Sequence, residues 1–149
     1  MEKNQLGRRS KTTKRKRLDS TVKEILSFYK KGVIHLAVKT FLVERYKVAL
    51  GHGMTATWSG TNIKARGYVA CYGGDHRFIA YFLTDDSPVP NPVYVVQNKV
   101  GAIFVPFKEM QPFVDLLRNE KPIYAYLNSN KPEWNNIKTS LEPIGEEET

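Results

Sequence analysis

The centre of the chain carries the pattern that most constrains its fold, an alternating run that ends in a tight turn. From Asn62 to Tyr72, small or apolar residues alternate with charged or aromatic ones, and a period of two is the period of a β-strand with two different faces. The turn-forming triplet Gly73-Gly74-Asp75 follows, and a second β-prone run extends from Arg77 to Thr84. This order predicts a β-hairpin.

Two segments have the period of an amphipathic helix. From Leu18 to Gly32, apolar residues recur at i, i+3, i+4 and i+7, and Gly32 is a typical C-terminal stop. From Phe107 to Asn119 apolar residues again keep helical spacing, with Pro112 in the first turn, where a missing N–H is tolerated. We therefore expect one helix before the strands and one after most of them.

Further β-prone runs surround the hairpin. A run from Val33 to Leu50 meets Gly51-His52-Gly53, which predicts a turn, and Val93 to Val105 predicts a second hairpin. A last strand is expected from Ile123 to Leu127, and Trp134 in the amide-rich segment after it is expected to pack against the body. The predicted fold class is α+β, a twisted, mostly antiparallel β-sheet with an N-terminal helix and a C-terminal amphipathic helix.

The first seventeen residues carry most of the charge imbalance. They hold eight basic residues and one acidic residue, whereas the other 132 hold fifteen basic and fourteen acidic ones, in a chain of net charge +8. A flexible cationic arm beside a near-neutral body predicts contact with a polyanion, nucleic acid first; a solubility arm, a membrane surface and a localisation signal stay open. The residues expected to contact nucleic acid are Arg8, Arg9, Lys11, Lys14, Arg15, Lys16 and Arg17.

The composition divides the chain into three parts and excludes several classes. We expect a disordered basic arm in residues 1–17, a single α+β domain in residues 18–141 and an acidic tail in residues 142–149. The single cysteine, Cys71, excludes an intramolecular disulfide. No apolar run approaches the roughly 20 residues of a membrane helix, and no apolar segment follows the charged N-terminus as in a secretory signal. The expected location is the cytoplasm, in association with the nucleoid, or the nucleus in a eukaryote.

The alternating strand offers the most specific candidate for a binding surface. Regular alternation places Lys64, Arg66, Tyr68 and Tyr72 on one face and small or apolar residues, Cys71 among them, on the other. Cations meet phosphates and aromatic rings stack on bases, so this face predicts contact with a single strand of DNA or RNA. The alternative is an ordinary solvated face, because edge strands also use charges against aggregation.

No residue pattern predicts catalysis or a bound metal. Asp75-His76 has no nucleophile in a recognisable context, and His35 and His52 stand alone. The phosphate-binding motifs GxxxxGK[ST] and GxGxxG are both absent. The sequence therefore predicts a protein without enzymatic activity, cofactor or metal; a small-molecule enzyme near His52, Asp75 and His76 is the least favoured alternative.

Two resemblances add to these inferences. The stretch GAIFVPFKEMQPFVDLLRNEKPIYAYLNSNKPEWNNIKTS resembles a block of small uncharacterised bacterial proteins, particularly cyanobacterial ones. Antiparallel strands leading into an amphipathic helix, behind the basic arm RRSKTTKRKR, are similar to Whirly and PC4-type single-stranded-DNA-binding transcriptional regulators. The second resemblance covers roughly Gly32 to Leu127 and implies a sheet surface that binds single strands in dimers or larger assemblies. A further strand after Leu117 departs from the simplest form of that pattern.

These features together predict a nucleic-acid-binding protein that prefers single strands, with transcriptional regulation as the implied role. We expect a homodimer or a higher oligomer, and no membrane partner. The alternative is a protein-interaction module whose basic arm docks on an acidic partner or a ribonucleoprotein assembly.

Overall fold

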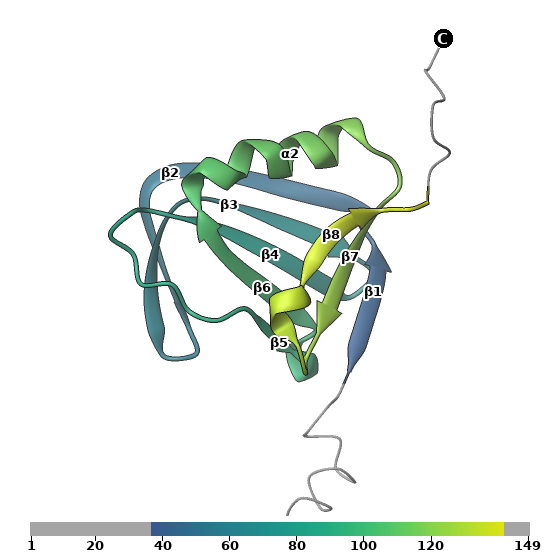
Figure 1. Cartoon of the computed structure of the whole chain (residues 1–149), viewed down its shortest axis with the longest axis horizontal. Coiled ribbons are helices and arrows are strands. Elements are labelled where there is room, and N and C mark those ends of the chain that lie inside the picture. The colour runs from purple at the N-terminus through teal and green to yellow at the C-terminus, as the bar shows by residue number, and fades with distance from the viewer. Residues whose placement is uncertain (1–36, 142–149) are drawn as a thin grey trace, which may run out of the picture. The chain divides into compact units, whose positions relative to one another are not determined.

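The structure, a computed structural model, describes residues 37–141, all within the compact unit Leu36–Thr149. The predicted basic arm, the predicted helix from Leu18 to Gly32 and the acidic tail lie outside these residues. The described part is an α+β fold with two sheets and one α-helix (Figure 1). Its elements are β1 (Val38–Leu42), β2 (Arg45–Trp58), β3 (Thr61–Gly73), β4 (His76–Leu83), β5 (Val93–Val95), β6 (Val100–Pro106), α2 (Met110–Asn119), β7 (Ile123–Asn128) and β8 (Asn136–Thr139).

The strands form a five-stranded sheet and a smaller three-stranded sheet. The larger has the order β2-β3-β4-β6-β5 and the smaller the order β1-β7-β8. All neighbours are antiparallel except β4 and β6, because the chain returns through a long loop and β5 before it enters β6 beside β4. The prediction of a mostly antiparallel α+β fold is confirmed in this coarse form, whereas the second sheet and the parallel pair were not predicted.

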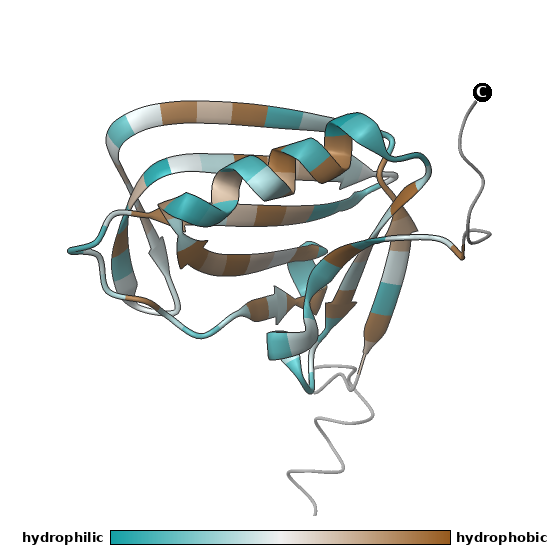
Figure 2. Ribbon diagram, turned by 45° about the horizontal axis from the view of Figure 1, so that its top comes forward, coloured by the Kyte–Doolittle hydropathy of each residue, from teal (hydrophilic) through white to brown (hydrophobic). Residues whose placement is uncertain are grey.

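One face of the five-stranded sheet is covered by α2 and by the three-stranded sheet. This covered face carries the fully buried side chains of Val69, Cys71, Phe78 and Phe82. Helix α2 contributes Met110, Val114 and Leu117 from its apolar side, and the banding of α2 in Figure 2 shows its hydrophobic and hydrophilic residues alternating along the helix. The predicted segment from Phe107 to Asn119 is therefore helical, with a 3₁₀ turn in its first three residues.

Both long hairpins end in two-residue turns whose residues fit the required backbone. The predicted hairpin is formed by β3 and β4, with Gly74 at φ 58° in its turn. The turn between β2 and β3 consists of Ser59 at φ 49° and Gly60 at φ 78°. Two successive positive φ angles are the type I′ pattern, whose twist matches that of the flanking strands.

The predicted turn at Gly51-His52-Gly53 is wrong, because β2 continues through it. The pairing with β3 passes from Leu50–Gly67 to Met54–Ala65, so β2 gains two residues relative to β3 at this point. Glycines tolerate such an irregularity, and the β2–β3 hairpin changes direction beyond it. A second core then forms on the face opposite α2; its buried members are Ile63, Ala65, Leu83, Ala102 and Phe104.

The segment after β7 also differs from its prediction. Trp134 is 61 % exposed rather than packed against the body, and the unpredicted strand β8 follows it. Asn135 is buried instead: its Nδ2 donates to the Val93 carbonyl at 3.0 Å, and its Oδ1 accepts from the Asn128 N–H at 2.9 Å. The amide is buried because it satisfies backbone groups of both sheets, which an indole N–H alone cannot do.

The glycines of these turns give a testable contrast in stability. A Cβ on Gly73 would collide with the carbonyl oxygen of Leu42, whereas a Cβ on Gly60 meets nothing but stands at a positive φ. Gly73→Ala should therefore lower the free energy of unfolding by about 3 kcal/mol or more through displaced backbone, and Gly60→Ala by about 1–2 kcal/mol through strain alone. Chemical denaturation of both variants measures the difference, and equal losses would contradict the close contact of β1 with β3.

Candidate nucleic-acid interface

A β-bulge in β3 decides which side chains share a face. Ala65 pairs with Leu83 and Gly67 pairs with Phe82, so Arg66 is an extra residue on β3. Leu83 and Phe82 are successive residues of β4 and point to opposite faces. Ala65 and Gly67 consequently also point to opposite faces, and the alternation that the sequence shows from Ile63 to Cys71 is broken in the middle.

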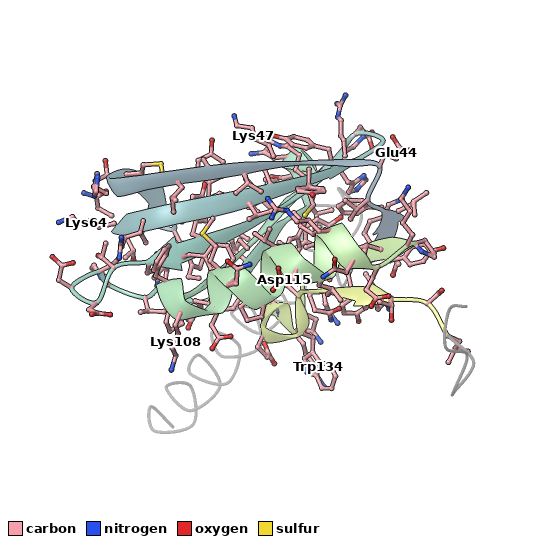
Figure 3. The ribbon with its side chains drawn as sticks, turned by 90° about the horizontal axis from the view of Figure 1, so that it is seen from above. Glu44, Lys47, Lys64, Lys108, Asp115 and Trp134 are labelled. Carbon is pink, nitrogen blue, oxygen red and sulfur yellow. The ribbon has the colours of Figure 1, made fainter. Side chains whose placement is uncertain are left out.

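The bulge separates the two predicted cations from the two predicted tyrosines. Lys64 Nζ lies 3.6 Å from the Asp86 carboxylate, and Figure 3 shows Lys64 at the far end of the sheet from Lys47. The Arg66 guanidinium lies over the Phe107 ring, 4.3 Å from its centroid, beside the start of α2. The prediction that Lys64, Arg66, Tyr68 and Tyr72 share one face is therefore wrong, and only the tyrosines share it.

The face opposite α2 instead gathers three tyrosines and three other cations. Across the strands, Tyr72 lies between Arg45 and Arg77, and Tyr68 pairs with Tyr81. We call this surface the tyrosine face; it consists of Tyr68, Tyr72, Tyr81, Arg45, Lys47 and Arg77. Figure 3 shows Lys47 on the side of the sheet away from Asp115 of α2.

Two of the three cations of the tyrosine face lie against its rings. The Arg45 guanidinium is 5.5 Å from the centroid of Tyr72, and Lys47 Nζ is 5.7 Å from that of Tyr68. The Tyr68 and Tyr81 rings are 6.1 Å apart. A side-chain hydrogen bond to Tyr68, with the nearby tyrosine oxygens, raises the pKa of Lys47.

Except for Arg45, the residues of the tyrosine face line a hollow of about 350 Å³. Its other lining residues are apolar or small: Met54, Thr55, Ala56, Ala65, Ala70 and Ile79. None of the residues that line it is acidic, and the salt bridges among the described residues do not include Arg45, Lys47 or Arg77. The hollow is therefore a concave, aromatic and positively charged surface.

The sequence contained a signal for the residues that the prediction missed. Arg45 and Lys47 alternate with Tyr46 and Val48 in β2, which is the pattern of a strand with one charged and one apolar face. Arg77 and Tyr81 likewise stand four residues apart in β4 and share one of its faces. Their neighbours depended on a register that the pattern does not fix, since a shift of one residue reverses every side chain.

The titratable candidates outside the tyrosine face lie in a salt-bridge cluster, in the core or on an exposed part of β2. Asp75 Oδ1 lies 2.8 Å from His76 Nδ1, and Asp75 Oδ2 accepts a hydrogen bond from Lys99, which ties the β3–β4 turn to the chain before β6. Cys71 is fully buried, and burial raises the pKa of its thiol to about 12, which makes it unreactive. His52 lies exposed on β2, and His35 lies outside the described residues.

Within residues 37–141, no three His, Cys, Asp or Glu side chains come together to hold a metal ion. No helix in this range is long and apolar enough to cross a membrane.

Comparison with protein-family models, curated proteins and solved structures gives no match to this chain. The resemblance to Whirly and PC4-type proteins therefore stays a prediction.

The Asp75 cluster predicts a specific pH dependence. Hydrogen bonds from Lys99 and His76 lower the pKa of Asp75 from 3.8 to about 2. A lowered pKa means that the cluster stabilises the fold above about pH 4 and that this contribution is lost as the pH falls towards about 2. Asp75→Asn should therefore reduce the fall in melting temperature between pH 5 and pH 2, most visibly at low salt because the carboxylate is exposed.

Asp85→Asn, in the exposed loop after β4, is the matched control for the loss of one carboxylate. If both variants alter the acid transition equally, the pairing of Asp75 with Lys99 and His76 contributes nothing specific.

Proposed function

We propose that this chain is a non-enzymatic nucleic-acid-binding protein that holds a single strand on the tyrosine face. The supporting observation is the hollow itself, which combines three tyrosines with unpaired cations and has no acidic residue in its lining. Aromatic rings provide stacking surfaces for bases, and the cations at the margin provide partners for phosphates. The sequence predicted that Lys64 and Arg66 contact phosphates; in this proposal Arg45, Lys47 and Arg77 make those contacts instead.

The shape of the face favours single strands over duplexes. Tyr68 and Tyr72 are four residues apart on β3, which corresponds to about 13 Å, with Ala70 between them. A base that has left its stack can lie over Ala70 against either ring, whereas the bases of a duplex expose only their edges in the grooves. The half-buried rings are held by their neighbours, so little side-chain entropy is lost on binding.

The basic arm adds sequence-independent affinity in this proposal. Its eight cations supply long-range attraction, and the tyrosine face supplies the preference for unpaired bases. A regulator of the Whirly or PC4 type, with the arm before a sheet that binds single strands, is the finer form of the proposal. The chain's location at the nucleoid belongs to the same proposal.

An acidic protein segment is the competing ligand for this surface. Arg45, Lys47 and Arg77 could pair with carboxylates without any stacking on the rings. The two ligands differ in what the tyrosines contribute, because a peptide of carboxylates needs the charges and a single strand also needs the rings. Substitution of tyrosine therefore distinguishes them.

Substitutions on the tyrosine face test the proposal directly. Tyr68→Ala and Tyr72→Ala should each weaken binding of a labelled single-stranded oligonucleotide by about 1–3 kcal/mol, with an unchanged salt slope, because each removes a stacking surface and no charge. Tyr72→Phe should bind as the parent does. Lys47→Ala and Arg77→Ala should reduce the slope of log affinity against log salt by about one unit each.

The chain offers matched controls for both substitutions. Tyr126 of β7 has the same cation–π arrangement, with Lys138 Nζ 4.9 Å from its centroid, but belongs to the three-stranded sheet. Tyr126→Ala and Lys64→Ala should leave binding unchanged. If the tyrosine substitutions on both sheets weaken binding alike, or if Lys64→Ala acts as Lys47→Ala does, the tyrosine face is not the site.

The arm is tested by its removal. Deletion of residues 1–17 should flatten the salt slope by several units, because each phosphate contact contributes about 0.7 unit for single strands. The melting temperature should stay the same, since Leu6 is the arm's one apolar residue beyond Met1 and is too little to form a core. An unchanged slope in oligonucleotide titrations would remove the arm from the proposal.

A further inference from the structure

We propose that the free edge of β2 pairs with the same edge of a second copy of this chain, antiparallel about a two-fold axis at Val48. The proposal concerns a surface on the covered-face side of β2 and is independent of what the tyrosine face binds.

The edge of β2 is long and apolar on one side. Among the described strands, β2 ends the five-stranded sheet and has β3 as its sole neighbour, although it is 14 residues long. Tyr46, Val48 and Leu50 are successive side chains on its covered-face side and are 39 %, 40 % and 70 % exposed. A long edge with a row of exposed apolar side chains is the type of strand that pairs with another strand.

A groove continues this apolar row towards α2. It has a volume of about 390 Å³ and runs between β2 and the helix. Its lining includes Val48, Leu50, Met110 and Val114, together with the cations Lys108, in the 3₁₀ turn before α2, and Arg118 of α2. Hydrophobic bands mark both elements in Figure 2. Since α2 closes one side of the groove and the sheet closes its floor, a partner strand at the β2 edge would cover the apolar residues that remain exposed.

Charge along the edge selects one register. A two-fold axis at Val48 sets Lys47 opposite Ala49 and Tyr46 opposite Leu50 of the second copy. At both ends it brings Glu44, the residue before β2, towards His52 in the irregular segment of β2. An axis at Lys47 would set two ammonium groups directly opposite each other, which is destabilising. An axis at Ala49 avoids that clash but loses the pairing of carboxylate with imidazole. The edge is therefore complementary to itself in the register of Val48.

This pairing has a geometric consequence. A two-fold axis perpendicular to the sheet keeps both α2 helices on one side, so the two grooves face each other across the new strand pair. Both tyrosine faces then lie on the other side of a continuous sheet, with Arg45 and Lys47 of the two copies near its centre. An isologous contact of this kind closes on itself and gives a dimer rather than a fibre.

The oligomeric state tests the pairing without any nucleic acid present. The full chain at tens of micromolar should have twice its mass of 17.1 kDa by light scattering. Val48→Lys and Leu50→Lys should each give a monomer with an unchanged circular dichroism spectrum, because both positions are exposed within one copy. Val89→Lys, in the loop before β5, is the matched control and should stay dimeric. A monomeric mass for the parent chain would overturn the proposal, whatever else then covers the groove.

Cross-linking tests the register. An axis at Val48 brings the two Cα atoms of that residue within about 4.5–5.5 Å, which a disulfide can bridge. Val48→Cys should therefore form a covalent dimer under mild oxidation, while Lys47→Cys should not, because its two copies are offset along the strands. The native Cys71 is buried and does not compete. A dimeric Val48→Cys variant that fails to cross-link, or equal cross-linking by Lys47→Cys, would overturn the register.

Discussion

The extra residue at Arg66 is the constraint on which the rest of the structure depends. On one side of it, Gly67, Val69 and Cys71 point into the core beneath α2; on the other, Ile63 and Ala65 point to the opposite face. Without the bulge, Ile63 and Ala65 would point to the same face as Gly67, Val69 and Cys71, and the second core around Phe104 would lose these two members. Bulges bend a strand and increase its twist, and Met54 and Ala65, which flank the two irregularities, both line the hollow of the tyrosine face.

The charges of the described part divide between structural and exposed roles. Lys64 is paired with Asp86, and Lys99 is paired with Asp75 in the turn cluster. The guanidinium groups and ammonium of Arg45, Lys47 and Arg77 have no carboxylate partner in the same range. A positively charged margin that lacks internal partners loses no ion pair when it meets an anion, so its attraction to a ligand is not offset by broken salt bridges.

Local sequence patterns predicted where the strands and the helix lie better than they predicted which side chains share a face of the sheet. The central hairpin, the helix from Phe107 and the last predicted strand follow from periods and turn residues, which are local in sequence. The absence of Lys64 from the tyrosine face could not be predicted, because the bulge at Arg66 is defined by pairing with β4, not by any residue type in β3. The same holds for Asn135, whose burial depends on backbone groups 7 and 42 residues away. Side-chain alternation is thus reliable only as far as the next bulge.

The three tyrosines of the tyrosine face differ in how firmly neighbouring side chains hold their rings. Tyr81 stacks on Phe104 with centroids 5.6 Å apart, and the Trp58 ring meets it edge-on at 5.9 Å. Tyr68 leans on Tyr81, whereas Tyr72 has Arg45 over its ring. Tyr81 is therefore held by packing, and Tyr68 and Tyr72 are the rings that we propose contact a ligand. A substitution of Tyr81 would lower the stability of the fold as well as the proposed binding. A ligand that stacks on Tyr68 would contact a ring whose position is already fixed by Tyr81. This preorganisation reduces the side-chain entropy lost on binding.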